Sequence, residues 1–328
     1  MEDSLPTQEL GTDEVDMQCN PPLPSIHPVV PLRVTILRTI MKVLPRRIKR
    51  LIYRSLCALS NRWGWRVHPV LHCLPFGLAL RRKTSFSTIQ HSSAVEAAGL
   101  KYLESSNIQG VNFPHLVDIT VDGDTAYTLT TYIDGDTLAS VLDHFTSQDW
   151  ERLVLDLRSQ LRSLRQQTTC ESQRPIICNA AGSTIIDDPR ISWVAESGRE
   201  LATTQGFFSQ VWLGLDLARN VDTIRPKIQP LIDRPGVSVN FCHGDVYPRN
   251  IILPGGLSAW RRGKSRVCFV DWEYSGWMPA PWEALKATLM ECEEDSEWLV
   301  TIRKVLPEFN EYLDADWEWR SKSNMMIV

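Results

Sequence analysis

Three side chains in the C-terminal half of the sequence have the types and spacing that phosphoryl transfer requires. Asp245 and Asn250 belong to the run F-C-H-G-D-V-Y-P-R-N-I-I-L at 241–253, and Asp271 ends the run V-C-F-V-D at 267–271. Transfer of a phosphoryl group from ATP needs a carboxylate to orient the accepting hydroxyl, and an amide oxygen with a second carboxylate to hold Mg²⁺ on the phosphates. We therefore expect Asp245 to be catalytic, and Asn250 and Asp271 to be metal ligands.

The segments around these residues must bring them together. Two apolar strands joined by a tight turn, for which Pro-Gly-Gly at 254–256 is suited, would place Asn250 and Asp271 close in space. We expect His243 to be structural, because its ring can bind backbone atoms and fix the loop that holds the aspartate. Glu273 would lie on the same side of an extended backbone as Asp271, and could reach the metal, the acceptor or a lysine.

The order of these motifs resembles the aminoglycoside phosphotransferase and choline kinase-like family, a branch of the kinase superfamily, and above all its members in filamentous fungi. The pattern of that family, roughly H-G-D-x-x-x-x-N, I-D-W-E and G-W-x-P-x-x-W-E, stands here at 243–250, 270–273 and 276–283. The resemblance implies an α+β, two-lobed protein-kinase-like fold, with a small β-rich N-lobe and a larger, mainly helical C-lobe. It also implies ATP and Mg²⁺ as cofactors, and transfer of the γ-phosphate to a hydroxyl of a small molecule.

On the nucleotide side, L-A-L-R at 78–81 aligns with the kinase strand V-A-I-K. Alternation along a strand places Ala79 and Arg81 on one face, so that Ala79 can lie against adenine while Arg81 reaches the phosphates. The family carries Lys at this position, whereas Arg is bulkier and presents a planar fork. The resemblance implies that Glu96 is the ion-pair partner of Arg81.

The segment T-Y-I-D-G-D-T-L at 131–138 resembles the hinge of this family, where the adenine edge would bind the backbone at Thr131 and Ile133. Hydrophobic periodicity predicts a strand over 75–83, a helix over 92–105 and a hairpin over 116–132. We therefore expect the chain to divide into four regions: a mobile tail at 1–30, a basic amphipathic helical extension at 31–61, a nucleotide-binding N-lobe at 62–135, and a C-lobe for catalysis and acceptor binding at 136–328.

Two interpretations of the basic extension remain open. Apolar residues recur at helical spacing in two pieces broken at Pro45, and basic residues flank them. The first interpretation is a helix over 32–60 that contacts a membrane surface or an acidic partner. The second, which we favour, is an extension packed on the small lobe with a solvated basic face, because such packing needs only one apolar stripe.

The amino-acid composition argues against several classes of function. The net charge of −4 arises from 35 basic and 39 acidic residues, so no general attraction to nucleic acid is expected. No apolar run reaches the about 18 residues of a transmembrane helix. The eight cysteines are scattered without a C-x-x-C pair, and the acidic start argues against a targeting segment, so we expect reduced thiols and a cytoplasmic location. The oligomeric state stays open.

A rival function is a catalytically weak pseudokinase that binds a nucleotide or a protein partner. Two features favour the pseudokinase: Arg stands in place of Lys at position 81, and no G-x-G-x-x-G precedes this strand. The presence of Asp245, Asn250 and Asp271 argues against it. The expected partner is a small-molecule hydroxyl acceptor. If that acceptor is a cationic amine, acidic residues must line its pocket; the candidates are Glu273, Glu283, Glu291, Glu293 and Glu294.

Overall fold

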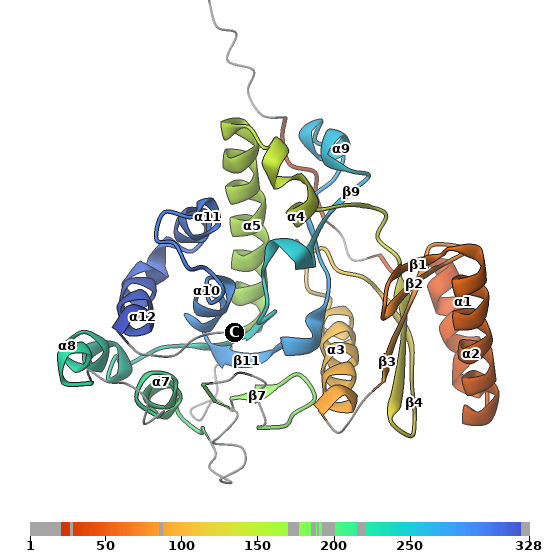
Figure 1. Cartoon of the computed structure of the whole chain (residues 1–328), viewed down its shortest axis with the longest axis horizontal. Coiled ribbons are helices and arrows are strands. Elements are labelled where there is room, and N and C mark those ends of the chain that lie inside the picture. The colour runs from red at the N-terminus through yellow and green to blue at the C-terminus, as the bar shows by residue number, and fades with distance from the viewer. Residues whose placement is uncertain are drawn as a thin grey trace, which may run out of the picture.

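The computed structural model describes residues 21–26, 29–84, 88–169, 177–184, 188, 190–191, 201–214 and 221–322. The chain forms a small lobe built on a β-sheet and a larger, mainly helical lobe (Figure 1). This is the α+β, two-lobed kinase-like architecture that the sequence predicts. None of the described helices is long and apolar enough to cross a membrane.

The small lobe is built on a five-stranded antiparallel sheet with the order β1-β2-β3-β5-β4. The strand expected to begin at Pro75 begins instead at Leu78, because Phe76 and Gly77 both have a φ of 64° and turn the chain between β2 and β3. The strands are β1 Arg66–His68, β2 Leu71–Leu74, β3 Leu78–Thr84, β4 Leu116–Asp122 and β5 Thr125–Thr131.

Helices cover both faces of this sheet. Helices α1 (Leu32–Val43) and α2 (Arg46–Trp63) lie on the outer face, and α3 (Thr88–Ser105) lies on the face that looks toward the large lobe (Figure 1). Pro45 separates α1 from α2, since proline is favoured before a helix and disfavoured within one. Leu100 and Leu103 of α3 are fully buried in the core of the large lobe, so this helix connects the two lobes.

The large lobe is organised around α5 (Ser147–Thr168). The Thr146 side chain accepts from the Asp149 backbone and the Asp149 side chain accepts from the Thr146 backbone, a capping box that fixes the start of this helix. One face of α5, which carries Leu153, Leu157, Leu161 and Leu164, is buried in the core. The other helices are α4 Leu138–Val141, α7 Thr204–Leu213, α8 Val221–Ile232, α9 Leu257–Arg261, α10 Trp282–Ala287, α11 Glu297–Val305 and α12 Asn310–Lys322.

Short strands of the large lobe carry the candidate site. They form two three-stranded sheets, in the orders β10-β9-β6 and β7-β11-β8. Phe269 of β10 pairs with Ile251 of β9, which places the segments after Asn250 and before Asp271 side by side. The strands are β6 Gly135–Thr137, β7 Cys178–Asn179, β8 Val239–Cys242, β9 Ile251–Pro254, β10 Cys268–Phe269 and β11 Gly276–Pro279.

The predicted tail over 1–30 lies largely outside the described residues. In its described part, the Pro21 carbonyl accepts a hydrogen bond from Arg152 Nη1 at 2.8 Å. The Ile26 carbonyl accepts one from the Gly110 backbone at 3.4 Å.

Candidate active site

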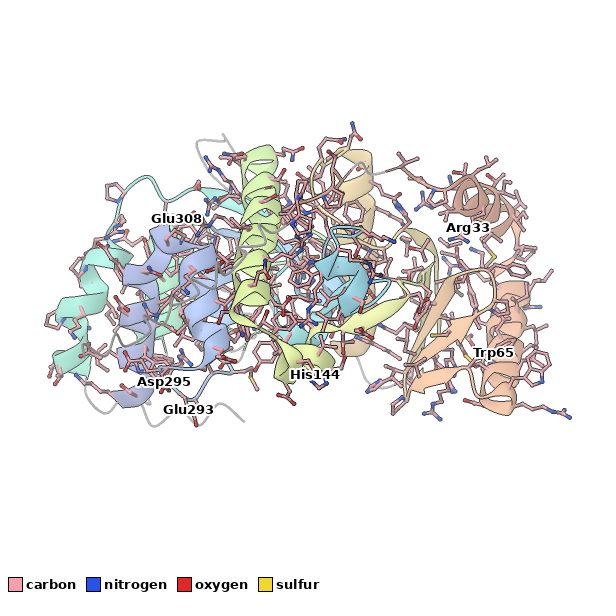
Figure 2. All side chains as sticks on the ribbon, turned by 90° about the horizontal axis from the view of Figure 1, so that it is seen from above. Arg33, Trp65, His144, Glu293, Asp295 and Glu308 are labelled. Carbon is pink, nitrogen blue, oxygen red and sulfur yellow. The ribbon has the colours of Figure 1, made fainter. Side chains whose placement is uncertain are left out.

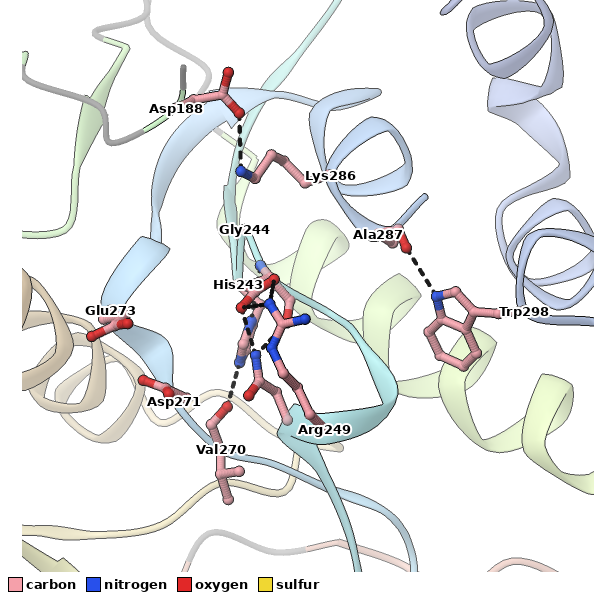
Figure 3. Close-up of polar contacts among 12 residues, drawn as sticks. Asp188, His243, Gly244, Arg249, Val270, Asp271, Glu273, Lys286, Ala287 and Trp298 are labelled. Atoms are coloured by element: carbon pink, nitrogen blue, oxygen red, sulfur yellow. Dashed lines mark hydrogen bonds and ion pairs between the residues drawn. The ribbon is translucent and has the colours of Figure 1, made fainter. Parts of the chain in front are cut away.

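The loop after β8 holds His243 and Asp245 in a fixed arrangement. The Asp245 backbone N–H donates to His243 Nδ1 at 3.2 Å, so Nε2 carries the ring proton and donates to the Val270 carbonyl at 3.0 Å (Figure 3). Burial lowers the pKa of His243, which favours the neutral ring. His243 therefore has the structural place that its spacing predicts, and it ties the Asp245 loop to the segment that ends in Asp271.

Both oxygens of the Asp245 carboxylate are held by neighbouring side chains. Asn250 Nδ2 donates to Asp245 Oδ2 at 2.6 Å, and Arg249 Nη2 contacts the two oxygens at 2.9 and 3.0 Å (Figure 3). Arg249 is exposed, whereas Asn250 is buried. A hydroxyl that approached Asp245 would compete with Arg249, because that contact lies on the solvent side of the loop.

Glu283 binds the backbone of the catalytic loop and does not face an acceptor. This residue of α10 is buried, and its two oxygens accept from the backbone N–H groups of His243 at 2.6 Å and Gly244 at 3.1 Å. Burial raises the pKa of Glu283 to about 7. The sequence-based expectation that Glu283 could bind a cationic acceptor is therefore wrong, since its carboxylate is occupied by the loop.

Asp271 and Asn250 lie close together, as predicted, although the connection between them differs from the expected one. The Val270 N–H donates to the Asn250 carbonyl at 2.9 Å. The turn at 254–256 leads into helix α9 rather than straight into the next strand. Asp271 itself has φ 67° and ψ 62°, a left-handed conformation that is uncommon outside glycine.

Arg81 of β3 reaches across the cleft to Asp271. Its Nη1 contacts Asp271 Oδ1, and lies 3.4 Å from Glu96 Oε1. The Arg81 charge lowers the pKa of Asp271 against the effect of burial, whereas burial of Glu96 raises its pKa. Glu96 Oε2 is buried without a hydrogen-bond partner. The structure thus brings together the predicted pair Arg81–Glu96 and adds Asp271 to it.

A second ion pair lies beside the first. Lys83, two residues after Arg81 on the same strand, contacts Glu273. The backbone after Asp271 is a short 3₁₀ turn at 272–274 and not the extended strand expected, so Glu273 points to the small lobe. Of the three partners that the sequence left open for Glu273, the structure shows the lysine.

A cavity between the lobes adjoins Arg81 and Asp271. Ala79 of β3 lines it, and so do Thr131 and Ile133 from the segment that the sequence assigned to the hinge. The Tyr132 N–H donates to the Gly77 carbonyl and the Thr131 N–H donates to the His115 carbonyl, both at 2.9 Å, so these two backbone N–H groups are already paired. Every residue that the sequence assigned to the nucleotide lines this cavity; the others in its wall include Leu71, Pro114, Ile252 and Val270.

The donor set fits a hard divalent cation bound with phosphates. Asn250 uses Nδ2 in its described hydrogen bonds, which leaves Oδ1 as a neutral oxygen ligand, and Asp271 supplies a charged one. The described residues contain no cluster of three or more His, Cys, Asp or Glu that could hold a metal alone. Two protein oxygens completed by phosphate and water are usual for Mg²⁺, so the residues present fit this ion.

Sequence reasoning missed two contacts of the site. The first is Arg249 on Asp245, for which the four-residue spacing of the two charges was the available signal. The second is the Tyr247 hydroxyl, which donates to Glu291 Oε1 at 2.9 Å. Glu291 is therefore a second acidic candidate, besides Glu283, that the structure connects to the catalytic loop.

The chain is similar to known phosphotransferases. The model of a family described as "Phosphotransferase enzyme family" matches residues 88–320. Aminoglycoside phosphotransferase APH(3'')-Id from Streptomyces rimosus, solved with ADP and streptomycin, is 12% identical, and the match covers 81% of this chain and 97% of that chain at a TM-score of 0.46. An aminoglycoside-3'-phosphotransferase of type VIII is 16% identical, with 81% and 95% covered and a TM-score of 0.46. No curated protein sequence matches the chain.

Proposed function

This chain belongs to the phosphotransferase enzyme family, and we propose that it transfers the γ-phosphoryl group of ATP to a hydroxyl of a small molecule with the help of Mg²⁺. One observation carries the proposal. Asp245 is hydrogen-bonded to Asn250, and this pair lies next to Asp271 at the mouth of the cavity lined by Ala79 and the hinge. The reaction is proposed for the cytoplasm, where ATP is available.

Asp245 is the proposed acceptor-side residue. Its carboxylate would hold the acceptor hydroxyl in line with the phosphoryl group and take the proton late, because little proton abstraction is needed in a loose transition state. Arg249 must release at least one oxygen of Asp245 for this to happen. Its exposed position allows that movement, since the guanidinium can turn into solvent without loss of core packing.

Asn250, Asp271 and Arg81 are the proposed phosphate-side residues. Mg²⁺, when bound, neutralises charge on the phosphate oxygens. Asn250 Oδ1 and the Asp271 carboxylate would hold it, and Arg81 would leave Asp271 for the α- and β-phosphates. Glu96 would then orient Arg81, because it already lies within ion-pair distance.

One observation favours a second candidate function, a pseudokinase that binds nucleotide with little transfer. Arg81 occupies the carboxylate that the metal needs, and a guanidinium pairs with a carboxylate more firmly than the usual lysine does. A protein that cannot break this pair would bind ATP poorly or without Mg²⁺. The two candidates therefore differ in the metal dependence of nucleotide binding.

A nucleotide thermal-shift assay separates the proposed function from its alternatives. Mg·ATP should stabilise the native state by about 2.7 kcal/mol at a hundredfold excess over its Kd. An unchanged melting temperature would contradict both the kinase and the nucleotide-binding pseudokinase. Stabilisation by ATP that is the same with and without Mg²⁺ would favour the pseudokinase.

Transfer is tested next by ADP release in a screen of amino alcohols and aminoglycosides. The matched control is Asp245→Asn, which keeps the size of the side chain but cannot take the proton. Acceptor-dependent ADP release that this variant abolishes supports the proposed reaction. Release that persists in Asp245→Asn would mean that another group acts on the acceptor.

A further inference from the structure

Helix α1 has two apolar faces, of which the sheet covers only one. Val34 and Met41 are buried against the small lobe, as an extension packed on that lobe requires. Four large aliphatic side chains recur every three or four residues on the opposite side and point to solvent. They are Leu32, Ile36, Ile40 and Val43, and the first and last are 75% and 77% exposed.

Helix α2 repeats this arrangement. Tyr53 and Cys57 are buried against the sheet. Another row of apolar side chains, Ile48, Leu51, Leu59 and Trp63, is exposed on the far side, with Leu51 at 62% and Trp63 at 56%. Most of the exposed large apolar side chains that the structure describes lie within residues 29–67. The two rows form the solvent-exposed side of the helix pair, which faces away from the sheet and is called here the outer face of α1 and α2.

The charges around this outer face are of one sign. No Asp or Glu occurs between Met17 and Val95. Lys49 pairs with Asp118, and Arg50 and Arg54 with Asp122, so these basic side chains fasten α2 to the sheet. In the part of the chain that the structure describes, Arg33, Arg46, Arg47 and Arg62 form no ion pair, and all four are exposed.

We propose that the outer face of α1 and α2 docks on the surface of an anionic lipid bilayer. A helix that lies in the bilayer interface buries an apolar face among the acyl chains, while its basic residues meet the phosphate groups. Trp63 lies at the end of α2, and its ring centroid is 4.8 Å from that of Trp65. Indole rings are favoured at the level of the headgroups.

Charge argues against a second copy of the chain as the occupant. A two-fold interface would bring the same patch of both copies together, and with it the unpaired arginines of both. The orientation of the molecule suits a bilayer. The end with Arg33 and Trp65 lies opposite the end with the acidic residues Glu293, Asp295 and Glu308 (Figure 2). Those acidic side chains would therefore point away from a negatively charged surface.

Docking in this way leaves the nucleotide cavity free, because the sheet separates the outer face from the cavity. Ala79 and Arg81 line the cavity side of β3, whereas α1 and α2 cover the other side of the sheet. The inference is thus independent of the proposed phosphotransferase function. A variant that loses bilayer binding should keep its affinity for Mg·ATP.

The experiment is co-sedimentation of the full chain with vesicles of phosphatidylcholine alone, or of phosphatidylcholine mixed with phosphatidylserine. We expect binding to the mixed vesicles that weakens as salt is raised, because salt screens the charges. Ile36→Ser/Ile40→Ser should weaken binding by about tenfold or more, since two aliphatic side chains no longer enter the acyl region. The control Leu155→Ser/Val300→Ser alters exposed apolar residues of α5 and α11 and should bind as the wild type does.

Charge reversal gives a second, separate test. Arg46→Glu/Arg47→Glu should also weaken binding by about tenfold or more, because each basic residue near an anionic surface contributes on the order of a fivefold gain in affinity. Arg225→Glu/Arg262→Glu changes the same number of exposed charges on the large lobe and serves as its control. All four variants should keep the wild-type melting temperature, since none of the altered side chains is buried.

Three results would overturn the proposal. The first is equal binding to neutral and mixed vesicles, because the arginines would then play no part. The second is the absence of binding to either. The third is a concentration-dependent dimer in sedimentation that Ile36→Ser/Ile40→Ser disrupts, which would assign this face to a contact between copies of the chain.

Discussion

Arg81 of β3 and Asp271 after β10 form an ion pair that joins the two lobes across the mouth of the cavity. Lys83 and Glu273 form a second pair beside it. In each pair the basic residue comes from the small lobe and the acidic residue from the large lobe. The pairs hold the lobes together, and the first one places a guanidinium on the carboxylate that we assign to Mg²⁺. Binding of Mg·ATP therefore has to exchange one partner of Asp271 for another.

The first prediction separates acceptor-side from phosphate-side residues. Asp245→Ala should abolish transfer yet leave Mg·ATP affinity nearly unchanged, because we propose that Asp245 holds the acceptor and not the metal. Asn250→Ala and Asp271→Ala should weaken Mg·ATP binding as well as transfer, since each removes an oxygen from the metal. Titration calorimetry with Mg·ATP and single-turnover transfer measure the two quantities. Equal loss of nucleotide affinity in all three variants would contradict the division.

The second prediction concerns the backbone of the catalytic loop. Gly244 has φ +77°, and a Cβ there would lie 2.4 Å from the Tyr274 carbonyl oxygen. Gly123 has φ +56°, and a Cβ added there would meet nothing within 4 Å, so it is the matched control. Gly123→Ala should cost about 1 kcal/mol in the free energy of unfolding, from the left-handed backbone alone. Gly244→Ala should cost clearly more, because the backbone of the loop or of the 272–274 turn must also move.

Urea denaturation of the two glycine variants measures this difference. An equal cost at both positions would show that the loop around Gly244 can shift without strain. In that case transfer by Gly244→Ala should also stay close to that of the wild type, because Asp245 would keep its place.

The sequence contained the chemistry of the site but not all of its contacts. That Asp245, Asn250 and Asp271 lie close together could be predicted because their spacing around apolar strands is local, and the hairpin over 116–132 could be predicted because its alternation is local. The Arg81–Asp271 pair joins residues 190 positions apart. Such a pair depends on how the two lobes pack against each other, and that packing cannot be predicted from a local sequence pattern.

Three further expectations from the sequence were wrong. Glu283 looked like an acceptor ligand because charged residues are usually exposed, whereas packing of α10 buries it under the loop. The strand expected over 75–77 is a turn, because an apolar run with one glycine is compatible with either structure. The apolar stripe that the periodicity of α1 shows is Leu32, Ile36, Ile40 and Val43. The sheet leaves this stripe exposed and covers Val34 and Met41 instead, so the expectation that the stripe packs on the small lobe was wrong.

The third prediction is a pH dependence of stability that arises from Glu283. Burial raises its pKa from 4.5 to about 7, so between these values the native state binds a proton that the unfolded state releases. The stabilisation from this proton is complete below about pH 4.5, and it is lost as the pH rises through 7. Since one pKa unit corresponds to about 1.4 kcal/mol, the whole change amounts to about 3 kcal/mol.

Glu283→Gln cannot titrate and isolates this effect. The free energy of unfolding of the wild type minus that of Glu283→Gln should decrease as the pH is raised from 5 to 8, whatever the other groups contribute. A difference that stays constant across this range would mean that Glu283 is ionised throughout, held in that form by the two backbone N–H groups.

The last prediction tests Arg81, where the chain departs from its family. If Arg81 moves from Asp271 to the phosphates, Arg81→Ala should weaken ATP binding about tenfold to a hundredfold, as expected for loss of a charged hydrogen-bond partner. Adenosine has no phosphates, so its affinity should change little. Arg82→Ala is the matched control, because Arg82 points to the other face of the same strand and is exposed.

Two conservative variants test the same role of Arg81. Arg81→Lys should preserve or raise transfer, because lysine offers the compact charge usual at this position and pairs less firmly with Asp271. Glu96→Gln should show a milder form of the Arg81→Ala defect, since it alters only the group that orients Arg81. If Arg81→Ala binds ATP and adenosine in the wild-type ratio, Arg81 is a lobe contact and not a phosphate ligand. Lys83 would then be the next basic residue to test, and the pseudokinase would gain support.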